Sequence, residues 1–142
     1  MTVESEAVNS FWESRTKGKL GKKSEKRGQE ILAVFARAKL AAKGAAIREA
    51  VSGIGFVDVL IKFSSGLLHV VELKMLKGND VPGTAQLAKY MTHLNRHEGW
   101  LVFFDARKTN RKTTIPVSFK TKAGTIRTVV IDINPIAPHE LK

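Results

Sequence analysis

The chain has 142 residues, 43% hydrophobic and 26% charged, a composition that suits one globular domain with one core. It has no cysteine, which excludes disulfides and thiolate metal sites and fits a reducing cytoplasm. Its net charge of +11 indicates a polyanionic partner, most often nucleic acid.

Membrane insertion and secretion are not expected from this sequence. No apolar run approaches the ~20 residues that a membrane-spanning helix needs. Glu4 and Glu6 precede any apolar run, which is unlike a signal peptide. We therefore expect a cytoplasmic protein without a membrane partner.

Residues 1–23 are predicted to be a basic arm, irregular or weakly helical, in front of a single domain over residues 24–142. The segment from Lys17 to Ser24 looks like a phosphate loop. It lacks the four-residue gap between the first glycine and Gly-Lys-Ser, and no strand precedes it, so we reject a nucleotide loop.

Basic residues gather in two segments, one within the arm and one between residues 107 and 122, on either side of a less basic centre. Such a distribution suits phosphate contacts around a reaction site. The residues predicted to make these contacts are Lys22, Lys23, Arg111 and Lys112.

The first predicted element is a helix over residues 24–43. Ile31, Leu32 and Phe35 recur at helical spacing, Ser24 is a candidate N-cap, and Gly44 ends the helix.

The remaining pattern alternates between strands and one further helix. Residues 45–52 read as a strand or a helical remnant, and the bracketing Gly44 and Gly53 favour a strand. The later elements are strands at 55–63 and 67–75, a helix at 83–97, a strand at 100–105, and a hairpin of strands 114–121 and 125–133. The order is α-β-β-β-α-β with an appended C-terminal β-hairpin in a 110–142 extension, so the class is mixed α/β.

The apolar hairpin at 55–77 contains three charged side chains, Asp58, Glu72 and Lys74, which cost free energy unless they are paired. A three-residue turn at Ser64–Gly66 sets Asp58 opposite Glu72, with Cβ atoms roughly 4.5–5.5 Å apart. Two carboxylates so close repel each other unless a cation lies between them, and Mg²⁺ is the natural choice.

Strand alternation puts Lys74 on the same face as Glu72, and the backbone carbonyl of Leu73 between them is a further candidate ligand. An ammonium beside such a metal helps phosphodiester hydrolysis by orienting water and offsetting transition-state charge. The alternative is an ordinary charge cluster on a solvated sheet face.

These residues resemble the PD-(D/E)xK nuclease superfamily, which has the restriction-endonuclease-like fold. The matching motifs are Gly-Phe-Val-Asp ending at Asp58, Glu-Leu-Lys at 72–74, and Gln-Leu-Ala-Lys-Tyr at 86–90. The last is similar to the Gln-x-x-x-Tyr motif of the RecB-like branch, and the set is similar to domains found beside AAA-type ATPases. The resemblance covers about residues 28–107 and implies an α-β-β-β-α-β core with a mixed central sheet flanked by helices.

By this resemblance, Asp58 and Glu72 bind Mg²⁺, for which Mn²⁺ can substitute, and Lys74 is the catalytic lysine. Glu30 on the first helix is implied as an added metal or water ligand, with Glu25 as its competitor. Gln86 is implied to line the site as part of the catalytic set.

Three further side chains are candidates for nucleic-acid contact, namely Arg48, Tyr90 and His93. Each has a structural alternative: Arg48 on an edge strand, Tyr90 in the core, and His93 on an exposed polar face with His97.

The leading hypothesis is a Mg²⁺-dependent deoxyribonuclease, an endonuclease cleaving DNA. A Holliday-junction-resolvase-like enzyme acting as a homodimer is an alternative within the same class. A non-catalytic nucleic-acid-binding module that keeps the fold is the alternative from another class. An ATPase partner follows only from the resemblance.

Overall fold

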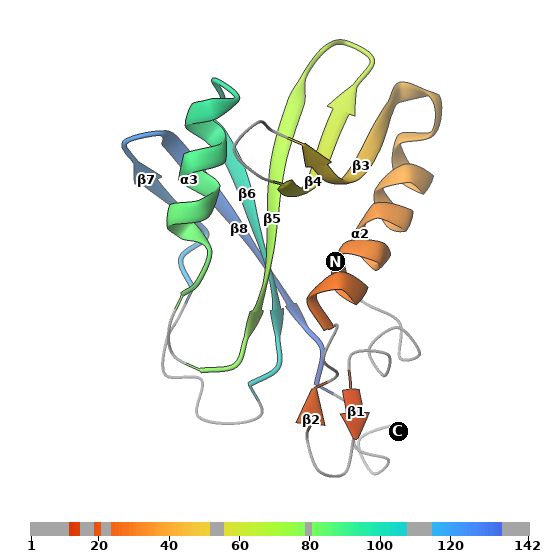
Figure 1. Ribbon diagram of the computed structural model, residues 1–142, viewed down its shortest axis with the longest axis vertical. Helices are drawn as coiled ribbons and strands as arrows, with labels where there is room; N and C mark the ends of the chain where they lie inside the picture. The colour runs from red at the N-terminus through yellow and green to blue at the C-terminus, as the bar shows by residue number, and fades with distance from the viewer. Residues whose placement is uncertain are drawn as a thin grey trace.

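The computed structural model describes residues 12–14, 19–20, 24–51, 56–78, 81–107 and 115–134. The elements are β1 (Trp12–Ser14), β2 (Lys19–Leu20), α2 (Ser24–Leu40), a 3₁₀ turn (Ala41–Lys43), β3 (Gly44–Val51), β4 (Phe56–Phe63), β5 (Leu68–Leu76), α3 (Thr84–His93), β6 (Glu98–Asp105), β7 (Ser118–Thr121) and β8 (Gly124–Asp132) (Figure 1). None of the described helices is long and apolar enough to cross a membrane.

One six-stranded sheet organises the chain, in the order β3-β4-β5-β6-β8-β7. The strands β3, β4 and β5 pair antiparallel, β5, β6 and β8 pair parallel, and β7 is antiparallel to β8. The predicted order α-β-β-β-α-β is therefore present, and the ambiguous segment before residue 52 is a strand.

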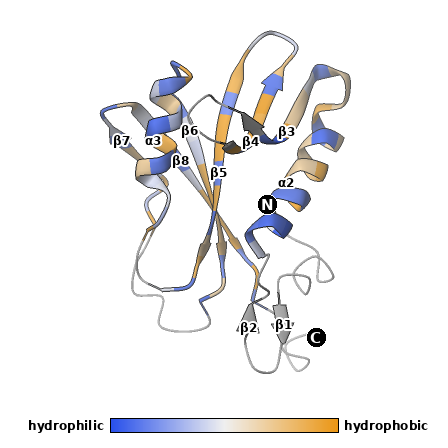
Figure 2. Ribbon diagram, in the orientation of Figure 1, coloured by the Kyte–Doolittle hydropathy of each residue, from blue (hydrophilic) through white to orange (hydrophobic). Residues whose placement is uncertain are grey.

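The two helices cover opposite faces of this sheet. α2 packs against β3, β4 and β5, whereas α3 packs against β5, β6 and β8. Successive residues of β6 alternate between the two cores: Val102 and Phe104 lie with α2, and Leu101 and Phe103 lie with α3. In Figure 2 the central strands are mostly coloured as hydrophobic, whereas hydrophobic and hydrophilic residues alternate along α2.

The predicted C-terminal hairpin is present, and it extends the main sheet next to β6. β8 pairs with β6 from Glu98↔Thr125 to Asp105↔Asp132. It buries Ile126 in one core and Ile131 in the other. Periodicity predicted the strand but could not assign its partner, because pairing with β6 joins residues far apart in the chain.

Two predictions need correction. Within the N-terminal segment, β1 and β2 form a small antiparallel pair, where we expected irregular or helical structure. α3 ends at His93 and not near residue 97, because Asn95 takes a left-handed backbone with φ of 52°.

The β4–β5 hairpin has the predicted register. Its turn is closed by the Phe63 amide donating to the Leu67 carbonyl at 2.8 Å and the Gly66 amide donating to the Phe63 carbonyl at 2.9 Å. The pairs then run from Lys62↔Leu68 to Val59↔Val71. Asp58 and Glu72 are the next two residues in this register.

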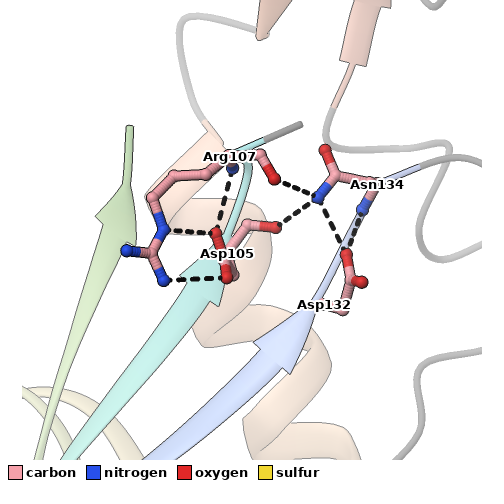
Figure 3. A network of polar contacts seen from close by, with 4 residues as sticks. All are labelled: Asp105, Arg107, Asp132 and Asn134. Atoms are coloured by element: carbon pink, nitrogen blue, oxygen red, sulfur yellow. Dashed lines mark hydrogen bonds and ion pairs between the residues drawn. The ribbon is translucent and has the colours of Figure 1, made fainter. Parts of the chain in front are cut away.

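A polar network joins the ends of β6 and β8 (Figure 3). The Arg107 guanidinium donates to the Asp105 carboxylate at 2.9 and 3.1 Å, and this pairing raises the pKa of Arg107. The Asn134 amide donates to the backbone carbonyl of Arg107 and to Asp132, each at 2.9 Å. Because the Asp105 carboxylate is already matched by a cation, this network is a structural tie between the parallel strands.

An apolar pocket of about 290 Å³ opens on the α2 face, between Leu32 and the strands β4, β5, β6 and β8. Its polar feature is His69, whose Nδ1 accepts a hydrogen bond from Trp100 Nε1 at 3.2 Å. The pocket lining carries no Asp, Glu, Lys or Arg, so it lacks the groups that phosphate chemistry needs.

Candidate active site

Glu72 is the most unusual side chain of the sheet. It lies in the middle of β5, opposite Leu101 of the parallel strand β6, and is fully buried. Among the described residues, neither carboxylate oxygen has a hydrogen-bond partner. Burying a carboxylate without hydrogen-bond partners is costly, so the site requires a proton or a cation that compensates it.

Asp58 is held next to Glu72 by two hydrogen bonds. Its Oδ2 accepts the Leu73 backbone amide at 2.9 Å, and its Oδ1 accepts the Gln29 side-chain amide at 2.9 Å. The bond from the Leu73 amide follows directly after the last β4–β5 pair, Val59↔Val71. There the Asp58 side chain accepts the β5 amide in place of a backbone carbonyl. The carboxylate orientation is therefore fixed from both β5 and α2.

Gln29 was not predicted as a site residue. It is buried on α2, on the same helical stripe as Leu32, Ala33 and Ala36. A polar residue within a buried stripe needs a hydrogen-bond partner, and that was the signal in the sequence that could have identified it.

Lys74 completes the group. Its Nζ lies 3.7 Å from Glu72 Oε1, and the side chain remains about a quarter exposed. The stem of Lys74 packs against Gly83, immediately before α3: a Cβ at position 83 would lie 2.8 Å from Lys74 Cγ. The start of α3 therefore limits where the ammonium can go.

Burial and mutual repulsion change the acidity of both carboxyl groups. Burial, followed by the neighbouring Asp58 charge, raises the pKa of Glu72 to about 8, against the opposing effect of Lys74. Burial also raises the pKa of Asp58, while the Leu73 amide and Lys74 act to lower it. Glu72 therefore retains a proton near neutral pH unless a cation replaces it.

Of the two helical glutamates that we considered, Glu25 is the one whose charge reaches the carboxylates. It raises the pKa of both Asp58 and Glu72. Glu30 instead pairs with Arg27 at 2.9 Å and Arg48 at 3.8 Å on the surface between α2 and β3. The structure does not bring Glu30 to the site, because it is one residue past Gln29 and thus turned about 100° away on the helix.

The donor set fits a hard divalent cation. Two carboxylates converge, and the Glu72 oxygens lack hydrogen-bond partners in the described structure. No group of three or more His, Asp or Glu side chains suited to a metal occurs among the described residues. Mg²⁺ accommodates this, since it usually keeps several waters and takes only one or two protein carboxylates.

The other predicted side chains make no described contact with Asp58, Glu72 or Lys74. Arg48 is half-buried beside Glu30, and Tyr90 is 7% exposed and part of the core around α3, which removes its ring from the surface. Gln86 and His93 line a groove on the outer side of α3. No described contact joins Gln86 to Asp58, Glu72 or Lys74.

Four predicted phosphate contacts, those of Lys22, Lys23, Arg111 and Lys112, lie outside the described residues. The Leu73 carbonyl stays a prediction as a ligand, since only its amide has a contact to Asp58.

A family model described as a domain of unknown function, DUF8371, matches residues 3–108. The chain belongs to the DUF8371 family. The match includes α2, the β4–β5 hairpin, α3 and β6, so Asp58, Glu72 and Lys74 lie within the DUF8371 domain and β7 and β8 lie beyond the matched region. The comparison with curated proteins finds no match.

Among solved structures, the DUF8371 chain is similar to SfsA of Pyrococcus furiosus, whose structure was determined in complex with Ca²⁺. The TM-score is 0.43 and the identity 18%, over 75% of this chain and 57% of that chain. The chain thus spans little more than half of the length of SfsA.

Proposed function

We propose that this DUF8371 protein is a metal-dependent nuclease that hydrolyses DNA phosphodiester bonds at Asp58, Glu72 and Lys74. The fold would then be a restriction-endonuclease-like core, for which the order α-β-β-β-α-β is expected. The observation that carries the proposal is Glu72, a buried carboxylate without hydrogen-bond partners in the described structure, next to a second carboxylate and a lysine.

Asp58 and Glu72 would hold Mg²⁺, with the Leu73 carbonyl as a candidate third ligand. When bound, the ion supplies Lewis acidity and lowers the pKa of a coordinated water. The residues around it determine how well this chemistry is positioned.

Lys74 supplies positive charge at the reacting phosphate. Its Nζ is tied to Glu72 at 3.7 Å, and its exposed fraction leaves it accessible to a substrate. An ammonium held in advance at this place stabilises charge that develops on the phosphate oxygens, without reorganising at the moment of reaction.

Gln29 and the Leu73 amide hold Asp58 in one orientation. Hydrogen bonds that neighbouring residues make to a metal-binding side chain fix its orientation and normally influence metal affinity strongly. The net charge of +11 favours a nucleic-acid substrate by attracting its phosphates.

The test is a cleavage panel of duplex, single-stranded and branched DNA with Mg²⁺ or Mn²⁺. The wild type is compared with Asp58→Ala and with Lys77→Ala, an exposed lysine next to β5 that serves as the matched control. We expect metal-dependent cleavage by the wild type and the control, and none by Asp58→Ala.

Two results would count against the proposal. Equal cleavage by wild type and Asp58→Ala would locate the activity elsewhere. DNA binding without cleavage of any substrate would favour a non-catalytic nucleic-acid-binding module.

A further inference from the structure

A groove of about 690 Å³ lies between α3 and the turn that joins β7 and β8. One wall is α3, which contributes Gln86, Lys89 and His93, and the other is the turn with Lys122. Figure 1 shows α3 and the β7–β8 hairpin side by side.

The groove begins next to the candidate active site. Gly83, whose neighbour is the Lys74 stem, directly precedes α3. Gln86, Lys89 and His93 follow at steps of three and four residues, which places them along one side of the helix. At 1.5 Å per residue, this row is ~10 Å long and can follow a short stretch of a strand backbone.

The lining is suited to phosphate oxygens. It offers two ammonium groups, an imidazole and an amide, and none of the lining residues is Asp or Glu. Ala85, Ala88, Thr92 and Ala123 fill the rest of the wall with small side chains, so a strand backbone can approach closely. Lys89 and Lys122 are both exposed.

The turn that carries Lys122 is fixed against the loop after α3. The Thr125 amide donates to the His97 carbonyl at 2.9 Å. Gly124, with φ of 139°, approaches this carbonyl so closely that a Cβ would lie 2.1 Å from it. Lys122 is therefore held opposite α3 by the backbone.

We propose that this groove binds the phosphate backbone of a DNA strand that extends from the active site along α3. Lys89 and Lys122 would contact phosphates from opposite sides. The proposal rests on the nuclease function for the identity of the substrate, but its test measures binding without cleavage. It also gives the β7–β8 hairpin a role, which is to form the second wall.

The test compares Lys89→Ala/Lys122→Ala with Lys43→Ala/Lys62→Ala, which removes the same charge from two exposed lysines away from the groove. Binding of a fluorescein-labelled oligonucleotide, as single strand and as duplex, is measured by anisotropy in EDTA over a range of salt concentrations. Each lost phosphate contact lowers the slope of log affinity against log salt by about 0.7 for a single strand or about 0.9 for a duplex.

In the groove variant, we expect the slope of log affinity against log salt to fall by the amount that corresponds to two phosphate contacts. In the control, the slope should stay near the wild-type value. Equal slopes in both double variants would overturn the groove proposal. A wild type that cleaves no DNA while the groove variant still loses slope would overturn the nuclease function and support the groove. In an active enzyme, the groove variant should raise KM and leave kcat unchanged.

Discussion

At the scale of single residues, Glu72 makes the stability of the fold depend on pH. Its pKa is about 8 in the folded state and 4.5 ordinarily, so between these values the folded chain holds a proton that the unfolded chain has released. Stability should therefore fall as pH rises from 4.5 through about 8. Urea unfolding across this range should show the decline, and Glu72→Gln should flatten it. If stability declined by the same amount in Glu72→Gln, the pH dependence would come from titratable groups other than Glu72.

Mg²⁺ should oppose this loss, because it binds the ionised carboxylates of the folded chain. At a concentration 100 times the Kd, the expected stabilisation is about 2.7 kcal/mol. Thermal unfolding with and without Mg²⁺ measures it. Asp58→Asn should lose the effect, and Lys77→Ala should keep it. An equal shift in Asp58→Asn would place the ion elsewhere.

Gln29 should act on the metal through Asp58. Gln29→Leu removes the donor at 2.9 Å from Asp58 Oδ1 and should weaken Mg²⁺ binding by about 10–100-fold. Glu30→Gln, on the neighbouring exposed position, should leave the Kd unchanged. Calorimetric titration of both variants with Mg²⁺ distinguishes them, and a larger effect in Glu30→Gln would reverse the assignment.

Asp58, Glu72 and Lys74 could be found from the sequence, because the turn length and the two-residue period of strands fix their relation once the hairpin is recognised. Gln29 could not be placed with them, since its contact depends on how α2 packs on the sheet. Glu30, one residue past Gln29, is rotated by about 100° on the helix and pairs with Arg27 and Arg48 instead.

At the scale of elements, the start of α3 should control Lys74. Gly83 has φ of 90°, and a Cβ there would meet the Lys74 stem. Gly66, in the hairpin turn, has φ of 91° and nothing within 4 Å. Both Gly→Ala changes should cost about 1 kcal/mol or more of stability through the backbone.

Only Gly83→Ala should also reduce DNA cleavage, because it displaces the ammonium. Melting temperatures and cleavage rates of the two variants separate backbone strain from this displacement. Equal cleavage rates would show that α3 does not position Lys74.

Local patterns predicted the strands and helices because apolar periodicity and glycines mark them well. The position of β8 beside β6 was not predictable in this way, since the partner of a strand depends on tertiary packing. The α3 terminus was also missed, because Leu94 continues the apolar spacing beyond the last helical residue.

At the scale of the whole molecule, Glu72 of the candidate site is buried in the sheet, whereas Lys89 and Lys122 of the groove are exposed. The two carboxylates lie within the sheet, while lysines such as Lys89 and Lys122 lie on an outer groove beyond α3. This separation suits a polyanion that is attracted by surface charge and hydrolysed where the carboxylates and Lys74 meet.

The most direct test of the account is the Mg²⁺-dependent cleavage rate of Lys74→Ala beside the wild type at saturating DNA. This variant keeps both carboxylates, so it removes the ammonium without removing the ligands of the ion. We predict a rate lower by about 10²–10³-fold, the usual effect of losing one group that stabilises transition-state charge. An unchanged rate would contradict the assignment of the active site to the β4–β5 hairpin.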